Sequence, residues 1–153
     1  MERIICLAIG YLFGMFQTSY IIGKIHHMDI RQYGSGNAGT TNALRTLGKK
    51  AGAMTLIGDM LKCVIAILIV DAVFKNRYQE ILPLLGMYTA AGCVLGHNFP
   101  FYLGFRGGKG IAASAGMLLA MDWRVFLICA VIFIGLVAIT RYVSLGSMAA
   151  YVG

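Results

Sequence analysis

The sequence is poor in charge, because lysine, arginine, aspartate and glutamate make up only 12% of it while 59% of the residues are hydrophobic. This composition excludes an ordinary soluble domain and indicates a polytopic membrane protein. Acidic residues are the scarcer charged type, 6 against 13 lysines and arginines, which leaves a net charge of +7. The cations are spread between apolar runs and not clustered, so we expect no nucleic-acid partner. They favour membrane lipid or an anionic substrate instead.

No two of the four cysteines stand in C-x-x-C spacing. We therefore predict neither a disulfide framework nor a metal site, and no cofactor is indicated. The apolar N-terminal run lacks an A-x-A-like cleavage site and is too long for a signal peptide, so it is interpreted as a membrane span. The four single cysteines lie inside apolar stretches, at Cys6, Cys63, Cys93 and Cys129.

Long apolar runs divide the chain into helices, since a hydrocarbon core of about 30 Å needs roughly 20 apolar residues per crossing. The predicted spans are residues 4–23, 51–74, 81–99 and 125–140, with another beginning at 142. The run 111–121 is too short to cross alone, so it either starts within the preceding loop or is a broken or tilted helix. We expect one all-α membrane domain over residues 1–153, a bundle of about five or six helices. The last run covers about half a bilayer, so the chain is expected to be incomplete at its C-terminus.

Two polar stretches interrupt the apolar runs, and both are rich in glycine. The first glycine stretch is YGSGNAGTTNALR (33–45) and the second is GFRGGKG (104–110). Glycine allows backbone N–H groups to turn inward around an anion, and arginine or lysine supplies full charge for a phosphate. Eight cations fall on the side of these stretches and four on the other, so the positive-inside rule places both in the cytoplasm. Together they predict a phosphate site at a membrane surface.

Two nucleotide-binding motifs match in letters only. Gly34, Gly36 and Gly39 satisfy G-x-G-x-x-G, and Asp59 follows at the distance of a dinucleotide fingerprint. No strand precedes these glycines, however, and Asp59 lies in a predicted span, so we reject that interpretation. The second glycine stretch resembles a Walker A loop, but its spacing is one residue short and Lys109 is followed by glycine.

Charged and titratable residues inside the apolar runs are the remaining candidates. Asp59 and Lys62 stand at i, i+3 on one helix face, and burying either costs about 2.5–3.5 kcal/mol. They form either a structural ion pair or a pair in which Lys62 points toward the glycine stretches. His97, just before the second stretch, is interpreted as a hydrogen-bonding support of the loop in preference to a catalytic base. His26 and His27 are placed at the membrane interface without a chemical role.

Three blocks of sequence resemble the bacterial membrane acyl-phosphate:glycerol-3-phosphate acyltransferases. They are DIRQYGSGNAGTTNALRTLGKKAG (29–52), GHNFPFYLGFRGGKGIA (96–112) and RYVSLGS (141–147). The resemblance implies a seven-helix fold of the bacterial inner membrane with its site on the cytoplasmic side. It implies acyl phosphate and glycerol 3-phosphate as substrates, with lysophosphatidic acid as product. The H-x-x-x-x-D pair of the commoner glycerolipid acyltransferases is absent.

The resemblance also implies roles for individual residues. Ser35, Arg45 and Lys109 match residues that serve the phosphorylated substrates, and Ser144 matches a serine that lines the same pocket. Attack would be direct, with a substrate phosphate oxygen helping to take the proton and no acyl-enzyme. Asp59, Lys62 and His97 would support the site. The other expected substrate-binding residues are Gly34, Gly36, Asn37, Thr41, Asn42, Gly107, Gly108 and Gly110.

The sequence departs from this family at three places. Cys63 stands where the family usually has glycine, and Ala113 where it usually has threonine. The chain also ends before the family's third motif, whose histidine and asparagine complete the phosphate site, so we expect weak or no activity from this chain alone. The competing interpretation is a non-catalytic anion carrier or channel that uses the same glycine stretches and Lys62. Acyl-chain preference and oligomeric state are left open.

Overall fold

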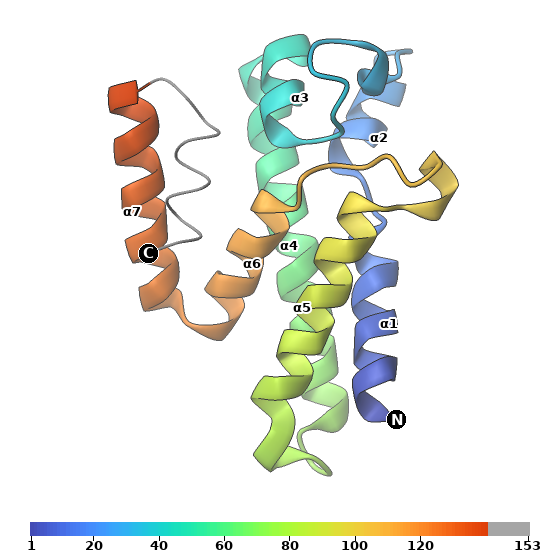
Figure 1. Ribbon diagram of the computed structural model, residues 1–153, viewed down its shortest axis with the longest axis vertical. Helices are drawn as coiled ribbons and strands as arrows, with labels where there is room; N and C mark the ends of the chain where they lie inside the picture. Colours follow the sequence, from blue (N-terminus) through green and yellow to red (C-terminus); the bar gives the residue numbers. More distant parts are fainter. Residues whose placement is uncertain (141–153) are drawn as a thin grey trace.

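The computed structural model describes residues 1–140, and every regular element within them is helical (Figure 1). The boundaries predicted for the apolar runs between residues 51 and 140 agree with the structure to within two residues, because a single apolar run can satisfy its backbone in lipid only as a helix. The span predicted to begin at residue 142 lies outside the described residues. The α-helices are α1 (Glu2–Gly14), α2 (Thr18–Ile25), α3 (Thr40–Leu47), α4 (Lys49–Phe74), α5 (Leu82–Asn98), α6 (Ile111–Met121) and α7 (Trp123–Thr140). Short 3-10 turns lie at Ile30–Gln32, Gln79–Ile81 and Phe101–Leu103.

The first span is broken, which differs from the continuous helix predicted over residues 4–23. It consists of α1 and α2, with Met15 to Gln17 between them. Gln17 has extended backbone (φ −102°, ψ 96°), and its side chain is fully buried. Its Nε2 donates to the carbonyl of His97 at 2.7 Å, so the break is held against the end of α5.

Helices α1 and α5 pack through glycine, and Figure 1 shows them side by side. Gly10 and Gly14 of α1 face Gly92 and Gly96 of α5, each pair at GxxxG spacing. A Cβ at Gly10 would lie 1.9 Å from the carbonyl oxygen of Thr89, and one at Gly96 would lie 2.2 Å from that of Tyr11. Small residues let membrane helices approach to backbone contact where water cannot drive them together. The α1–α5 pair is therefore the rigid base of the bundle.

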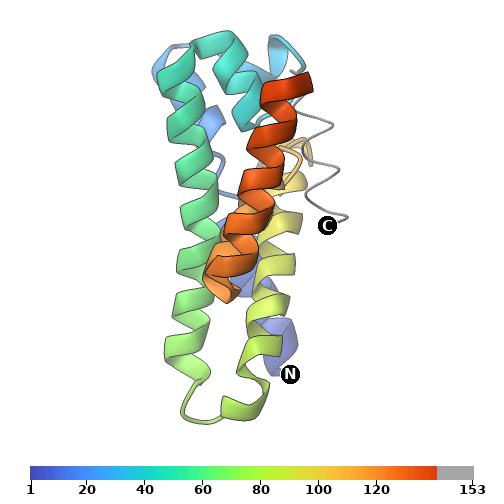
Figure 2. The ribbon, with the colours of Figure 1, turned by 90° about the vertical axis from the view of Figure 1, so that its left-hand side faces the viewer.

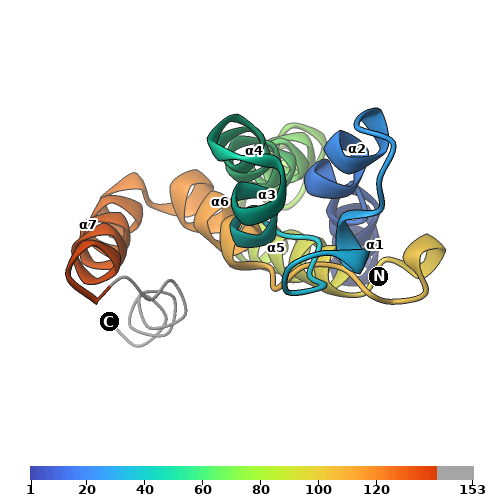
Figure 3. The ribbon, with the colours of Figure 1, turned by 90° about the horizontal axis from the view of Figure 1, so that it is seen from above.

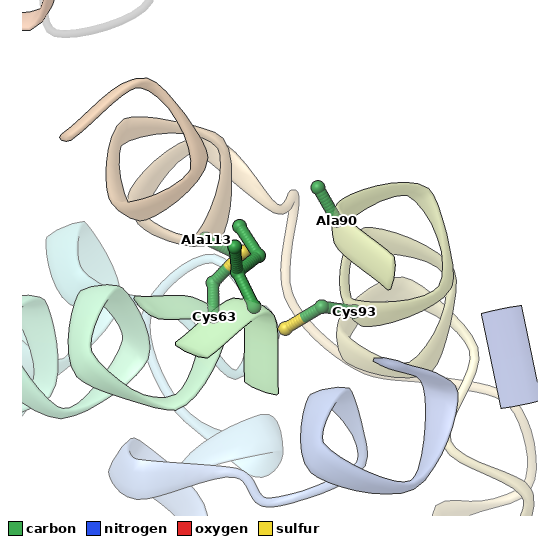
Figure 4. Packing of buried hydrophobic residues seen from close by; sticks show 5 residues of the cluster. Cys63, Ala90, Cys93 and Ala113 are labelled. Carbon is green, nitrogen blue, oxygen red and sulfur yellow. The ribbon is translucent and has the colours of Figure 1, made fainter. Parts of the chain in front are cut away.

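The core between α4, α5 and α6 is built from small side chains. Cys63, Ala90, Cys93 and Ala113 are fully buried there, and Figure 4 shows them projecting into one space from the three helices. Cys63 and Ala113 are the two positions that depart from the resembled family. Both belong to this one buried cluster.

The outer surfaces of the helices are apolar, as expected of a protein in lipid. Three helical stretches are long and apolar enough to cross a membrane, namely Glu2–Ile25, Lys49–Phe74 and Trp123–Thr140, and Ile111–Met121 is a shorter apolar helix. Helix α7 has no buried residue; it lies at one edge of the molecule beside α6 (Figures 2 and 3). The N-terminus and the α4–α5 turn lie at one end of the bundle, and both glycine stretches lie toward the other (Figure 1).

Candidate anion site between the two glycine stretches

The two glycine stretches are in direct contact although about 70 residues separate them. The Ala38 N–H donates to the carbonyl of Gly107 at 3.4 Å. Close by, the Arg31 guanidinium donates through Nη1 to the carbonyl of Leu103 at 2.8 Å, which ties the chain before the first stretch to the chain before the second. The two glycine stretches, which the sequence predicts to hold phosphate, therefore meet toward one end of the bundle (Figure 1).

Asn42 organises the first glycine stretch from inside. Its side chain is 1% exposed, and its Oδ1 accepts from the Ser35 N–H at 2.9 Å while its Nδ2 donates to the carbonyls of Ile30 and Tyr33, both at 3.0 Å. Gly34 has φ +61°, and a Cβ there would lie 2.2 Å from Asn42 Oδ1, so only glycine fits. The Asn42 amide is thus bonded to the loop backbone, and its expected role in substrate binding stays a prediction.

An Asp29–Arg31 pair fixes the entry to the first glycine stretch. Asp29 accepts from the Arg31 guanidinium at 2.7 Å and from the Arg31 backbone N–H at 3.0 Å. The hydrogen bond from Arg31 lowers the pKa of the Asp29 carboxyl below its ordinary value, and the same bond raises the pKa of Arg31. The pair is partly exposed, so its main effect is geometric: it aims Arg31 at the second stretch.

The second glycine stretch lies on the C-terminal end of α5. The Gly107 N–H donates to the carbonyl of Asn98 and the Gly108 N–H to that of His97, both at 3.0 Å. A Cβ at Gly107 would lie 1.9 Å from the His97 carbonyl oxygen, and one at Gly108 would lie 2.0 Å from His97 Nε2. These two N–H groups close the last turn of α5, and their glycines are required for close approach. A substrate-binding role of Gly107 and Gly108 stays a prediction.

Each glycine stretch leads into the N-terminus of a helix. Helix α3 begins at Thr40 after Gly39, and α6 begins at Ile111 after Gly110. The first N–H groups of a helix have no partner within it, and with the helix dipole they favour an anion. Among residues 1–140, the backbone N–H groups of Lys109 and Gly110 donate no turn or loop hydrogen bond, so the loop retains donors at its end.

The predicted phosphate-binding side chains are accessible. Ser35, Thr41, Arg45 and Lys109 are all exposed, and within the described part of the chain none of these four side chains is in a hydrogen bond or an ion pair with another residue. Their polar ends are therefore available to a ligand. Gly36 and Asn37 lie in the same turn, before the Ala38 contact. Ser144 lies outside the described residues.

A buried polar cluster lies beneath the site, where α4 and α5 meet the break in the first span. Lys62 Nζ lies 3.0 Å from Asp59 Oδ1, as their spacing predicts, and 2.7 Å from His97 Nδ1. It also donates to the carbonyls of Gly14 and Phe16 at 3.1 and 2.7 Å. The ion pair of Lys62 with Asp59 is confirmed, and Lys62 also contacts His97, on which the second glycine stretch rests. A role of Lys62 in the site itself stays a prediction.

Several structural residues of the site were missed from sequence. Gln17 and Thr18, at the break, hold His97 and Asp59 respectively, with Thr18 Oγ1 donating to Asp59 at 3.1 Å. Arg31, just before the first glycine stretch, was likewise not predicted to hold the second. A buried glutamine within an apolar run is the signal that could have found the break, because such an amide needs a partner.

Comparison with known proteins gives one consistent family. The sequence model described as glycerol-3-phosphate acyltransferase matches residues 4–153. A glycerol-3-phosphate acyltransferase of Clostridioides difficile is 55% identical over 147 residues, which are 95% of this chain and 71% of that protein. One of Lactiplantibacillus plantarum is 46% identical over 154 residues, 99% of this chain and 71% of that protein.

The fold is similar to a solved structure as well. The glycerol 3-phosphate form of PlsY (YgiH), an integral membrane glycerol 3-phosphate acyltransferase, superposes with a TM-score of 0.84 at 35% identity, covering 99% of this chain and 74% of that one. A second structure of PlsY, in its lysophosphatidic acid form, gives a TM-score of 0.82 at 34% identity and covers 99% of this chain and 73% of that one.

Proposed function

The chain belongs to the glycerol-3-phosphate acyltransferase family, and we propose that it transfers an acyl group from acyl phosphate to the 1-hydroxyl of glycerol 3-phosphate. The products are lysophosphatidic acid and inorganic phosphate, an early step of phospholipid synthesis. The contact between Ala38 and Gly107 carries the proposal, because it joins two phosphate-type loops along one edge. Two phosphorylated substrates need two such sites side by side.

Arg45 and Lys109 are the proposed phosphate ligands. Arginine offers a planar fork of donors that matches two phosphate oxygens, and lysine offers a compact point charge. The N-termini of α3 and α6 add backbone donors beside them. Ser35, with its hydroxyl exposed on the same loop, supplies a neutral donor for the acyl carbonyl or a phosphate oxygen.

An apolar groove next to the second glycine stretch suits the acyl chain. It has a volume of about 470 Å³ and runs between α4, α6 and α7, beginning at Ile111 and Ala112. The groove is lined almost entirely by carbon, including Met60, Phe126 and Phe133. An acyl phosphate with its phosphate at Lys109 would place its chain here without burying a polar group.

The transfer needs no cofactor and no acyl-enzyme. The 1-hydroxyl oxygen bonds to the acyl carbonyl carbon, the bond from that carbon to the bridging phosphate oxygen breaks, and the hydroxyl proton passes to a phosphate oxygen. Arg45 and Lys109 hold the reactants in line and stabilise the charge on the carbonyl oxygen and the leaving phosphate. The protein therefore contributes position and electrostatics.

The proposed location is the bacterial inner membrane, with both glycine stretches in the cytoplasm. Helix α4 begins with Lys49 and Lys50 at the end of the bundle where the glycine stretches lie. Its opposite end is followed by Lys75 and Arg77. Further cations on the loop side give the excess expected of a cytoplasmic face. We treat residues 1–153 as part of one membrane domain.

The alternative, a non-catalytic anion carrier, draws on the break in the first span, since broken helices line the sites of many carriers. Here the carbonyls of Gly14 and Phe16 at the break accept from Lys62, and Gln17 binds His97. The break is thus filled by the protein's own side chains. The accessible cations lie at the end of the bundle, which favours the acyltransferase.

Purified protein in detergent, given acyl phosphate and glycerol 3-phosphate, should release inorganic phosphate and form lysophosphatidic acid. Arg45→Ala or Lys109→Ala should lower kcat/KM by about 100-fold, equivalent to about 3 kcal/mol of transition-state binding. The free energy of unfolding should not change. Lys75→Ala, at the far end, is the matched control and should remain active. Phosphate uptake into vesicles without product formation would favour the carrier.

A further inference from the structure

The buried ammonium of Lys62 has an unusual set of neighbours. It is 5% exposed, and within 3.1 Å it meets a carboxylate oxygen, two backbone carbonyls and the Nδ1 of His97. An ammonium has three hydrogens and no acceptor. Its hydrogens are therefore shared among these four acceptors, and none of the four can present a hydrogen of its own to Lys62.

This requirement decides the state of His97. An imidazole whose Nδ1 accepts from Lys62 at 2.7 Å cannot carry a hydrogen on that nitrogen, so its single hydrogen is on Nε2. A doubly protonated ring would set an N–H against the ammonium. Nδ1 is also 3.8 Å from Asp59 Oδ1, beyond hydrogen-bond distance and farther than Lys62 Nζ. The carboxylate is occupied by Lys62 and Thr18 instead.

The other side of the ring faces the second glycine stretch. A Cβ added to Gly108 would lie only 2.0 Å from His97 Nε2, so this nitrogen is packed directly against Gly108. The Gly108 N–H also donates to the His97 carbonyl. The next residue along the chain is Lys109. An Nε2–H donor therefore points at the loop that carries the proposed phosphate ligand.

We propose that Lys62 is a positioning residue: its ammonium fixes His97 in the Nε2–H form, so that His97 offers a hydrogen-bond donor to the second glycine stretch and to a phosphate held there. This rests on the proposed function. The same ammonium caps the C-terminal carbonyls of α1, so one charge couples the break in the first span to the phosphate loop. Asp59 balances that charge inside the membrane.

The tautomer can be measured without any turnover. The full sequence contains three histidines, so ¹⁵N-histidine labelling of the whole protein in detergent gives few signals. The variants His26→Gln and His27→Gln identify the signals of those two residues and leave that of His97. We expect His97 to be protonated at Nε2 and bare at Nδ1. Asp59→Asn combined with Lys62→Met removes both buried charges together and should release this preference. A hydrogen on Nδ1 in the wild type would overturn the proposal, whether or not the chain is an acyltransferase.

The role of the donor is tested by two isosteric replacements. His97→Gln places an amide N–H near the Nε2 position, whereas His97→Asn places a carbonyl near Nδ1 where it can accept from Lys62. If the donor matters, His97→Asn should weaken glycerol 3-phosphate binding, measured by calorimetry, by about tenfold or more, and His97→Gln should retain most of it. The opposite ranking would show that His97 only satisfies Lys62 and would overturn the positioning role. His26→Asn and His26→Gln, at an exposed site, are the controls.

Discussion

The two glycine stretches bring similar sequences to one edge of the molecule but are held there in different ways. The first is held by side chains: the Asn42 amide fills its centre, and the Asp29–Arg31 pair fixes its entry. The second is held by main chain, because Gly107 and Gly108 dock their N–H groups on the last carbonyls of α5. The first stretch therefore depends on the identity of a few side chains, and the second depends on the absence of any.

The largest effect should come from adding one methyl group to the second stretch. Gly108→Ala would place a Cβ 2.0 Å from His97 Nε2, so the loop must move off α5, and a displacement of about 1 Å at a phosphate site costs roughly 100-fold in kcat/KM. Steady-state kinetics with glycerol 3-phosphate measures this loss. Gly39→Ala is the control in the first stretch, since its Cβ would be 3.6 Å from the nearest atom and its φ is −134°. Equal activity of the two variants would contradict the account of the second stretch.

A smaller effect, measured in stability, is expected at the centre of the first stretch. Asn42→Leu removes the partners of one backbone N–H and two carbonyls, which should cost about 2 kcal/mol in the free energy of unfolding. Asn42→Asp keeps the acceptor for the Ser35 N–H but loses both donations, so its cost should lie between Asn42→Leu and the wild type. Unfolding by SDS titration in mixed micelles measures both. A leucine variant as stable as the wild type would show that the amide does not hold this stretch.

The smallest effect is expected at the entry to the first stretch, and it depends on pH. The lowered pKa of Asp29 means that its ion pair stabilises the fold fully above the ordinary aspartate pKa and loses this contribution as pH falls through the lowered value. Because the pair is partly exposed, the contribution should be below about 1 kcal/mol. Between about pH 6 and pH 3, wild type should lose stability relative to Asp29→Asn, measured as the unfolding midpoint. Parallel curves for the two proteins would mean that the pair contributes nothing.

Most of the fold could be predicted from the sequence because lipid leaves an apolar run few alternatives. The helices at 51–74, 81–99, 111–121 and 125–140 follow from hydropathy alone. The break at Met15–Gln17 did not follow, since methionine and phenylalanine continue the apolar run and only Gln17 interrupts it. Its cause lies far along the chain, in Lys62 and His97.

The candidate site could be located from the sequence but not resolved into roles. Glycines beside lysine and arginine mark a phosphate site by composition, and the two stretches do meet. Composition does not reveal that Asn42 points inward or that the Gly107 and Gly108 N–H groups already have partners, because both depend on which carbonyls α5 and the loop present. The local sequence pattern thus predicts that the stretches bind an anion, but only the tertiary contacts show which hydrogen-bond donors already have a partner within the protein.

Arg45 and Lys109, one from each stretch, are proposed to act on the same pair of phosphorylated substrates. A double-mutant cycle on kcat/KM with Arg45→Ala, Lys109→Ala and the combined variant measures whether they do. We expect the two losses to be non-additive, with a coupling energy of about 1 kcal/mol or more, because both cations stabilise one transition state. Losses that simply add, with each single variant retaining full glycerol 3-phosphate binding, would contradict a shared site.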